Sequence, residues 1–397
     1  MQAERGFAPI LIVVVIAIVA LIGFVVIGSI DKSKEPPPFI KKLAEDIGRR
    51  PGGASDPEGH DEFSNLPECS GQQYSVALVD IDKIDSVTPL GNLNPPEHTN
   101  PTEHMYIGLT ENGVTLLAPG DMTITSISSS ENKERRSTDY SLEFSLCKDV
   151  HGYFIHIKTL TAELQGLLTE DNCELYGEGN KYKNCWAGVQ KKLKAGEVIG
   201  TVGNSSQGNF DFGTYDLRVT NDFANPDRYR SRSPNIVCPF DYYTAALKDD
   251  FYKKLDRNKN PVCGQINYDV AGTLQGNWFI GDTSPDMPEG WNKILSFAKS
   301  NFDPDVAVIS IGGVFTQPST YSFIPTREGF INRAFDEVKP DGNIYCFESD
   351  PETTSESKST SGKILVKLVS DTELSIEHQS GSCEGNYSLA NPTVYER

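Results

Sequence analysis

The chain has 397 residues, enough for two or three domains, and its 36 basic and 55 acidic side chains give a net charge of −19. A globule this acidic repels phosphate backbones, and no Lys/Arg-rich run compensates, so nucleic-acid binding is excluded. The eight cysteines contain no C-x-x-C spacing. They favour disulfides in an oxidising compartment over a zinc knuckle, with unrelated buried thiols as the alternative.

The first element along the chain is an uncharged apolar run from Phe7 to Ile30. At about 1.5 Å per residue, a helix over this run reaches roughly 36 Å, enough to cross a hydrocarbon core of about 30 Å. We predict a transmembrane anchor at 7–30, and a cleaved secretory signal is the alternative. Because of the cysteines, the bulk of this single-pass membrane protein is expected outside the cytoplasm.

The residues around the start of the apolar run resemble the N-terminus of type IV pilin-like proteins. Arg5-Gly6-Phe7 precedes the run, as in those proteins, but Leu11 stands where the mature pilin helix usually has a glutamate. The resemblance is confined to the anchor region. It implies an alternative function, a pilin-like envelope subunit organised through its N-terminal helix.

Residues 31–71 are rich in proline and glycine and poor in apolar side chains, which is typical of a stalk or linker. From residue 72 onward, alternating polar and apolar residues predict strands. We predict a β domain at 72–262. Its predicted strands are 74–79, 114–117, 122–127 and 140–146, and the predicted helices of this half of the chain are 39–49, 159–168 and 241–255.

A second, small, barrel-like β domain is predicted at 263–397. Its expected elements are a helix at 291–299 and strands at 306–311, 344–348, 363–369, 373–379 and 386–389. The fold class is therefore mainly β, with an N-terminal transmembrane helix and two β domains. Plausible disulfide partners are Cys173 with Cys185, Cys238 with Cys263, and Cys346 with Cys383, although eight cysteines permit about 105 pairings.

Three motifs between Thr88 and Val219 carry a family resemblance. They are the turn Leu117-Ala118-Pro119-Gly120, the strand Tyr153-Phe154-Ile155-His156-Ile157, and the hairpin from Leu193 to Gly203. Together they resemble the lysostaphin/LytM-type zinc metallopeptidases, which cut peptidoglycan cross-bridges. The resemblance implies a duplicated hybrid motif fold for the first β domain.

Members of that family hold zinc with the His and Asp of an H-x-x-x-D motif and with the second His of an H-x-H motif. In this chain His104 matches the first ligand, but Gly108 stands at the place of the aspartate. The H-x-H position reads Thr214-Tyr215-Asp216, so that Asp216 replaces one histidine and Thr214 the other. His156 keeps the position of a catalytic histidine.

Two interpretations of these departures remain open. A rewired zinc site would draw its ligands from His98, His104, Asp211 and Asp216, because two histidines and one carboxylate make an acceptable catalytic set. In the other interpretation, both histidines belong to a structural loop and both aspartates bond backbone amides.

We favour a non-catalytic domain without a cofactor, because a ligand and a base have both been lost. The predicted function is a binding or structural role at the cell envelope, against peptidoglycan or another surface glycan. An active zinc metallopeptidase or amidase acting on peptidoglycan is the alternative.

Overall fold

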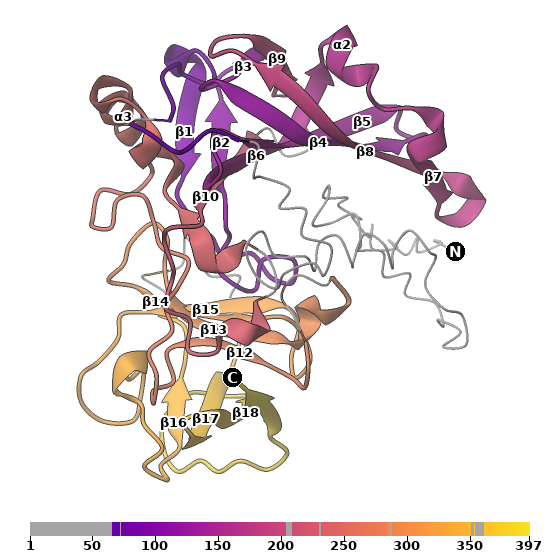
Figure 1. The fold of residues 1–397 in the computed structure, drawn as a ribbon. Helices are drawn as coiled ribbons and strands as arrows, with labels where there is room; N and C mark the ends of the chain where they lie inside the picture. Colours follow the sequence, from indigo (N-terminus) through magenta and orange to yellow (C-terminus); the bar gives the residue numbers. More distant parts are fainter. Residues whose placement is uncertain are drawn as a thin grey trace, which may run out of the picture.

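The computed structural model describes residues 66–71, 73–203, 209–229, 232–283, 285, 288–350, 353 and 361–397. The predicted anchor at 7–30, its pilin-like start and the helix at 39–49 lie outside these residues. Within the described part of the chain, none of the helices combines the length and apolarity needed to cross a bilayer. Figure 1 shows that the described chain is dominated by strands, so the prediction of a mainly β protein is confirmed.

The first sheet has 11 strands, eight of them in the order β1-β2-β10-β6-β5-β4-β8-β7, while β3, β9 and β11 pair at its sides. The strand pairings of this sheet are antiparallel within the described residues. The strands are β1 (Ile84–Thr88), β2 (Met105–Leu109), β3 (Val114–Leu117), β4 (Met122–Asn132), β5 (Ser137–Ser145), β6 (Val150–Leu160), β7 (Cys173–Tyr176), β8 (Tyr182–Leu193), β9 (Val198–Val202), β10 (Asn209–Asp216) and β11 (Ile236–Val237).

The two faces of this sheet differ in polarity because side chains alternate along each strand. Ile127 of β4 lies opposite Leu142 of β5 and Ala187 of β8, and all three belong to the buried apolar side. The next residue of β4, Ser128, lies opposite Ser141 and Trp186 on the other face. The sheet therefore has one face packed on the core and one polar face.

The second sheet has eight strands in the order β15-β14-β13-β12-β19-β18-β17-β16. Its ends approach each other, since the Asp350 amide donates to the Ser322 carbonyl at 2.8 Å and Ile331 forms a bridge with Cys346. The predicted barrel-like character of this part is thus confirmed. The strands are β12 (Gly276–Phe279), β13 (Ile294–Lys299), β14 (Ala307–Ile311), β15 (Ser319–Phe323), β16 (Tyr345–Phe347), β17 (Lys363–Ser370), β18 (Glu373–Gln379) and β19 (Thr393–Glu396).

The helices are short and lie at the edges of the sheets (Figure 1). They are α2 (Ala162–Gln165) and α3 (Ala245–Tyr252), with 3-10 turns η2 (Ile81–Lys83), η3 (Glu170–Asn172), η4 (Glu178–Asn180), η5 (Pro226–Arg228), η6 (Ser233–Asn235), η7 (Pro239–Tyr242), η8 (Pro288–Lys293) and η9 (Phe335–Glu337). The helix predicted at 159–168 is shortened because β6 continues to Leu160 and Thr161 caps α2. The helix predicted at 241–255 is confirmed only over 245–252.

Three of the predicted elements are wrong. Residues 74–79 form no ladder and contribute one isolated bridge, from Tyr74 to Tyr243. The helix predicted at 291–299 is η8 followed by strand β13, whose first five residues are all buried. A short run buried on both faces has no periodicity that separates strand from helix. The strand predicted at 386–389 is absent from the described residues there, and β19 lies at 393–396.

All eight cysteines are paired in disulfides. The pairs Cys173–Cys185, Cys238–Cys263 and Cys346–Cys383 are the predicted ones, and Cys69 pairs with Cys147. Four disulfides fit an oxidising, extracytoplasmic environment.

Buried Arg257 links the segment after the first sheet to the second sheet. Its Nη1 donates to the carbonyls of Ser300 at 3.1 Å and Asn301 at 3.2 Å, and its Nε donates to Lys259 O at 3.0 Å. The Asn301 amide in turn donates to Pro89 O at 3.2 Å. A single guanidinium thus satisfies three carbonyls between the two sheets.

Replacing Arg257 with alanine is expected to lower the free energy of unfolding by about 1.5–3 kcal/mol, the usual worth of hydrogen bonds to a charged group. Arg257 is 3% exposed, so the carbonyls would be left without compensation by water. Urea denaturation followed by tryptophan fluorescence measures the change. Arg135→Ala, at an exposed turn, is the matched control. Equal midpoints for the two variants would contradict this role.

Candidate functional site

Four ionisable side chains form a continuous row across the polar face of the first sheet, here called the acid–base row: His104, Asp211, His156 and Asp139. His104 Nε2 lies 3.4 Å from Asp211 Oδ2, and His156 Nε2 lies 3.6 Å from the same oxygen. His156 Nδ1 is hydrogen-bonded to Asp139 Oδ2 at 2.6 Å. The row runs through adjacent strands, because His104 directly precedes β2 and the others lie on β10, β6 and β5.

The position of His156 depends on an irregular backbone. Asp211 pairs with Ile155, so in a regular strand the next residue, His156, would face away from Asp211. Instead, His156 has a φ of 65°, in the left-handed region that non-glycine residues rarely adopt. The register between β5 and β6 also shifts between Tyr140 and Leu142. The bulge therefore turns the imidazole toward both aspartates.

Burial and charge act together on the pKa values of the row. Burial by itself lowers the pKa of His156, but the charges of Asp211 and Asp139 outweigh it and raise this pKa to about 9. Burial raises the pKa of Asp211 to about 7, against the opposing charge of His156. Burial, aided by the charges of His98, Arg232 and His156, lowers the pKa of His104. The row thus holds a charged His156 beside a neutral His104.

Aromatic rings and one guanidinium surround the row. The His104 ring lies 5.0 Å from that of Tyr106 and 5.6 Å from that of His98. Arg232 stacks on Tyr153 with its guanidinium carbon 3.6 Å from the ring centroid, and it pairs with Glu143 at 3.1 Å. These contacts enclose the row, and Asp211 is 1% exposed.

The structure brings together three of the five predicted site residues, His104, His156 and Asp211, and places His98 in ring contact with His104. Asp216 is elsewhere: it accepts hydrogen bonds from Arg218, with Nη2 at 2.7 Å, and from the Tyr242 hydroxyl at 2.5 Å. Asp216 is therefore an internal ion-pair partner. The prediction that both aspartates bond backbone amides holds for Asp216, which accepts from the Arg218 amide at 3.0 Å.

Asp139 was missed by the sequence reading. Asp139 is spaced two and four residues from Ser141 and Glu143, so it lies on the same polar face of β5, and the strand pattern could have predicted this. Its contact with His156 depends on the bulge in β6, which leaves no recognisable trace in the sequence. Arg232 was missed for a similar reason, since it reaches the sheet from a loop distant in the chain.

The residues of the row do not fit a zinc centre as they are placed. Across residues 66–397, outside the gaps given above, no group of three or more His, Cys, Asp or Glu side chains is arranged to hold a metal ion. Asp211 Oδ2 faces both imidazoles as an ion-pair acceptor, and Asp139 engages the second nitrogen of His156. However, His104 Nε2 and Asp211 Oδ1 are buried and have no hydrogen-bond partner among the described residues.

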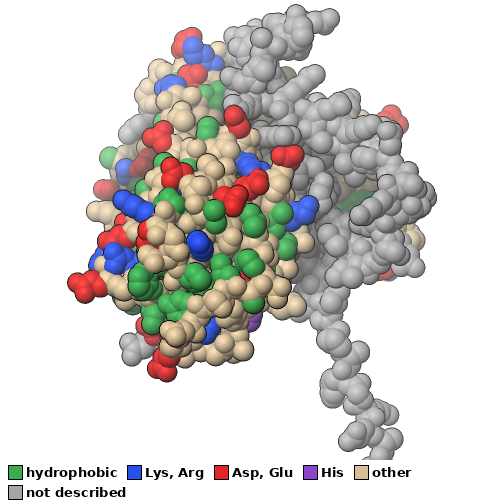
Figure 2. Space-filling model, turned by 90° about the horizontal axis from the view of Figure 1, so that it is seen from below, with side chains coloured by type: hydrophobic (Ala, Val, Ile, Leu, Met, Phe, Trp, Pro, Cys, Tyr) green, Lys and Arg blue, Asp and Glu red, His purple; other side chains and the backbone are tan. Residues whose placement is uncertain are grey.

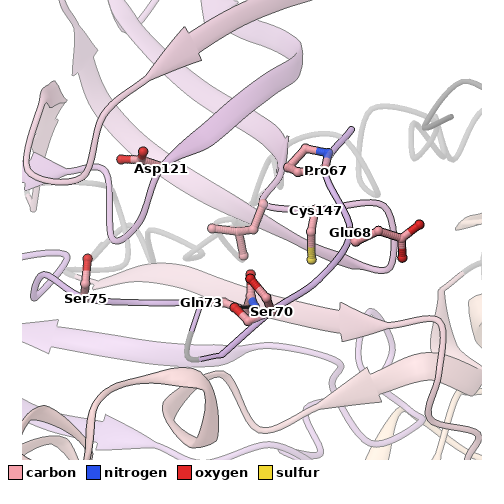
Figure 3. Close-up of a pocket in the computed structure, with 8 residues that line it drawn as sticks. Pro67, Glu68, Ser70, Gln73, Ser75, Asp121 and Cys147 are labelled. Carbon is pink, nitrogen blue, oxygen red and sulfur yellow. Dashed lines mark hydrogen bonds between the residues drawn. The ribbon is translucent and has the colours of Figure 1, made fainter. Parts of the chain in front are cut away.

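A cavity of about 270 Å³ lies away from the row, beside the Cys69–Cys147 disulfide (Figure 3). Its two carboxylates already have partners: Glu68 pairs with Lys148 at 2.7 Å, and Asp121 pairs with Lys194 at 2.7 Å. No buried polar atom of the described lining residues lacks a partner. The described residues lining the cavity therefore present neither an unpaired carboxylate nor an unpaired buried polar atom to a ligand.

Protein stability is expected to fall as pH rises from about 6.5 to about 9.5. The folded-state pKa of His156 is raised from 6.5 to about 9, so its contribution is complete below the unfolded pKa and is lost as pH rises through about 9. The loss is on the order of 3 kcal/mol. Thermal denaturation over this range measures it.

The pH dependence should be much flatter in His156→Gln. His378→Gln, which changes a histidine of β18 outside the row, should keep the slope of the unchanged protein. A slope that is the same in all three proteins would show that His156 does not carry the titration.

No protein-family model, curated protein or solved structure matches the chain. The resemblance to lysostaphin/LytM-type peptidases therefore stays a prediction that depends on the three motifs.

Proposed function

We propose that the protein is a membrane-anchored, extracytoplasmic component of the cell envelope. Its first β domain, a degenerate relative of lysostaphin/LytM-type peptidases, binds or supports an envelope polymer and does not cleave it. The observation that carries this proposal is the interlocked acid–base row. Asp211 is shared between two imidazoles, and Asp139 holds the one that would have to act as a base.

The surroundings of the row support a structural use of these side chains. His156 is 4% exposed and Asp211 1%, so bulk water is excluded from the ion pair. The charges of Asp211 and Asp139 raise the pKa of His156, which favours its protonated form, and a protonated imidazole does not accept a proton from water. The four disulfides support an oxidising, extracytoplasmic location.

The charge of the surface bears on the kind of polymer. Figure 2 shows acidic and basic side chains interspersed among apolar ones on the face it displays, and the whole chain carries a net charge of −19. A polyanion such as a nucleic acid would be repelled by this excess of negative charge. A neutral envelope polymer meets no such barrier.

The second candidate is an active zinc metallopeptidase or amidase, with ligands from His104, Asp211 and His98. One observation favours it: His104 Nε2 and Asp211 Oδ1 are buried and lack hydrogen-bond partners among the described residues, and a metal would satisfy both. Asp216 is no longer a candidate ligand, because Arg218 and Tyr242 occupy its oxygens.

Zinc content and lytic activity of the purified full chain separate the two candidates. We expect less than stoichiometric zinc by plasma mass spectrometry, and no solubilisation of purified peptidoglycan above that of His156→Ala. Stoichiometric zinc, together with lysis that His156→Ala abolishes, would overturn the proposal in favour of the peptidase. Arg135→Ala serves as the surface control.

A further inference from the structure

The loop between β18 and β19 contains the triplet Asn386-Tyr387-Ser388. An asparagine followed two positions later by serine or threonine, with any residue except proline between them, is the acceptor sequence for N-linked glycosylation. Such triplets also arise by chance, so the meaning of this one depends on the compartment and on how the fold presents the asparagine. The four disulfides fit an extracytoplasmic compartment, where this modification takes place.

The fold presents the Asn386 side chain to solvent. Asn386 and Ser388 are both exposed, and no hydrogen bond joins the Asn386 amide to another described residue. Residues 386–389 form neither a helix, a strand nor a turn. Because this segment is not part of a sheet ladder, an enzyme can bind it without breaking the hydrogen bonds between two strands. The acceptor amide is therefore accessible in the folded protein.

Open space lies beside the acceptor. A Cβ placed on the preceding residue, Gly385, would have no heavy atom within 4 Å apart from those of its chain neighbours, and the same holds for Gly381 at the start of the loop. An N-linked glycan is bulky and needs a surface position of this kind. The loop therefore has room for a sugar next to the Asn386 amide.

Contacts on both sides of Asn386 hold the loop in place. Before it, the Cys346–Cys383 disulfide ties the loop to β16. After it, the Ser388 carbonyl accepts a hydrogen bond from Gln379 Nε2 at 2.9 Å. Neither contact uses the Asn386 amide or the Ser388 hydroxyl, which are the two groups that define the acceptor. Attachment of a glycan would therefore leave the contacts of the loop intact.

The same loop contains a matched asparagine that is not an acceptor. Asn391 is exposed like Asn386, and Thr393 follows it at the required distance. However, Pro392 occupies the middle position, where proline is excluded because its ring fixes φ at about −65°. The backbone N–H of Asn391 also donates to Glu377 Oε2 at 3.0 Å. The two asparagines therefore separate the effect of the acceptor sequence from that of exposure.

We propose that Asn386 is an N-glycosylation site whose donor is a lipid-pyrophosphate-linked oligosaccharide. The proposal rests on the extracytoplasmic location proposed above. In the transfer, Asn386 Nδ2 forms a bond to C1 of the first sugar, and the bond from C1 to the pyrophosphate oxygen breaks. The lipid pyrophosphate leaves with the electron pair of that bond, and the amide nitrogen gives one proton to a base of the transferase. The glycan is then carried by the second β domain, whereas the acid–base row lies on the first sheet.

Mass spectrometry of the full chain, isolated from its native cells, tests the proposal. Asn386 and Asn391 lie on the same tryptic peptide, because neither Lys nor Arg stands between them. Electron-transfer fragmentation keeps a glycan on its residue and so distinguishes the two. We expect a glycan on Asn386 and none on Asn391.

Variants expressed in the same cells give a second readout, the electrophoretic mobility of the full chain. All of them carry Asn204→Gln, which removes the acceptor triplet Asn204-Ser205-Ser206, so that a shift reports Asn386 alone. Asn386→Gln and Ser388→Ala are expected to lose the shift. Ser388→Thr keeps a hydroxyl and should retain it, and the matched control Asn391→Gln should retain it as well. The serine pair keeps the test valid even if Asn386→Gln failed to fold.

Three results would each overturn the proposal: an unmodified Asn386 in the native chain, a glycan that persists in Ser388→Ala, or equal modification of Asn391. Thiol labelling of the same preparation reports the compartment separately. Unreactive cysteines together with an unmodified Asn386 would contradict the glycosylation site and leave the extracytoplasmic location standing. The zinc and lysis measurements are independent of both, so a failed modification site is distinguishable from a failed non-catalytic function.

Discussion

Asp211→Ala is expected to lower the free energy of unfolding by about 3–5 kcal/mol, the range for breaking a buried ion pair by removing one partner. Asp211 is 1% exposed and its Oδ2 lies within 3.6 Å of both His104 and His156. Without it, the buried, charged His156 keeps only Asp139. Chemical denaturation at neutral pH measures the loss.

Asp305→Ala is the control for this loss, because Asp305 also pairs with a cation, Lys259, at 2.7 Å but on the surface. Exposed pairs contribute about 0–1 kcal/mol, so this variant should change stability little. A similar small effect for Asp211→Ala would mean that the row is not an internal ion pair. Zinc-dependent stability of the unchanged protein, lost in Asp211→Ala, would instead support the peptidase.

The strand pattern predicted part of the fold because polar and apolar residues alternate along some strands of both sheets. In β5 and β18 polar and apolar residues alternate, and these strands were placed close to their observed positions. The prediction was wrong at β13, where both faces are buried, and at residues 74–79, where alternation occurs without a pairing strand. Pairing depends on residues distant in the sequence, so local periodicity does not report it.

The site was predictable only in part. His104, Asp211 and His156 could be singled out as candidates, and the structure brings them into one row. The hydrogen bond between His156 and Asp139 depends on the positive φ of His156, and the residue type does not predict that backbone conformation. The hydrogen bonds that Arg218 and Tyr242 donate to Asp216 likewise depend on the conformation of the chain after β10.

Replacing Cys69 and Cys147 together with alanine is expected to cost about 4.5 kcal/mol, more than the loss of any other disulfide. This disulfide closes the longest loop, with a sequence separation of 78, and cross-linking distant residues restricts the unfolded chain most. The corresponding change at Cys173 and Cys185, separated by 12 residues, should cost about 3 kcal/mol. Denaturation of both double variants measures the order. If the short-loop pair proved the more costly, the Cys173–Cys185 bond between β7 and β8 would have to stabilise the folded state directly, as a clamp on the edge of the sheet.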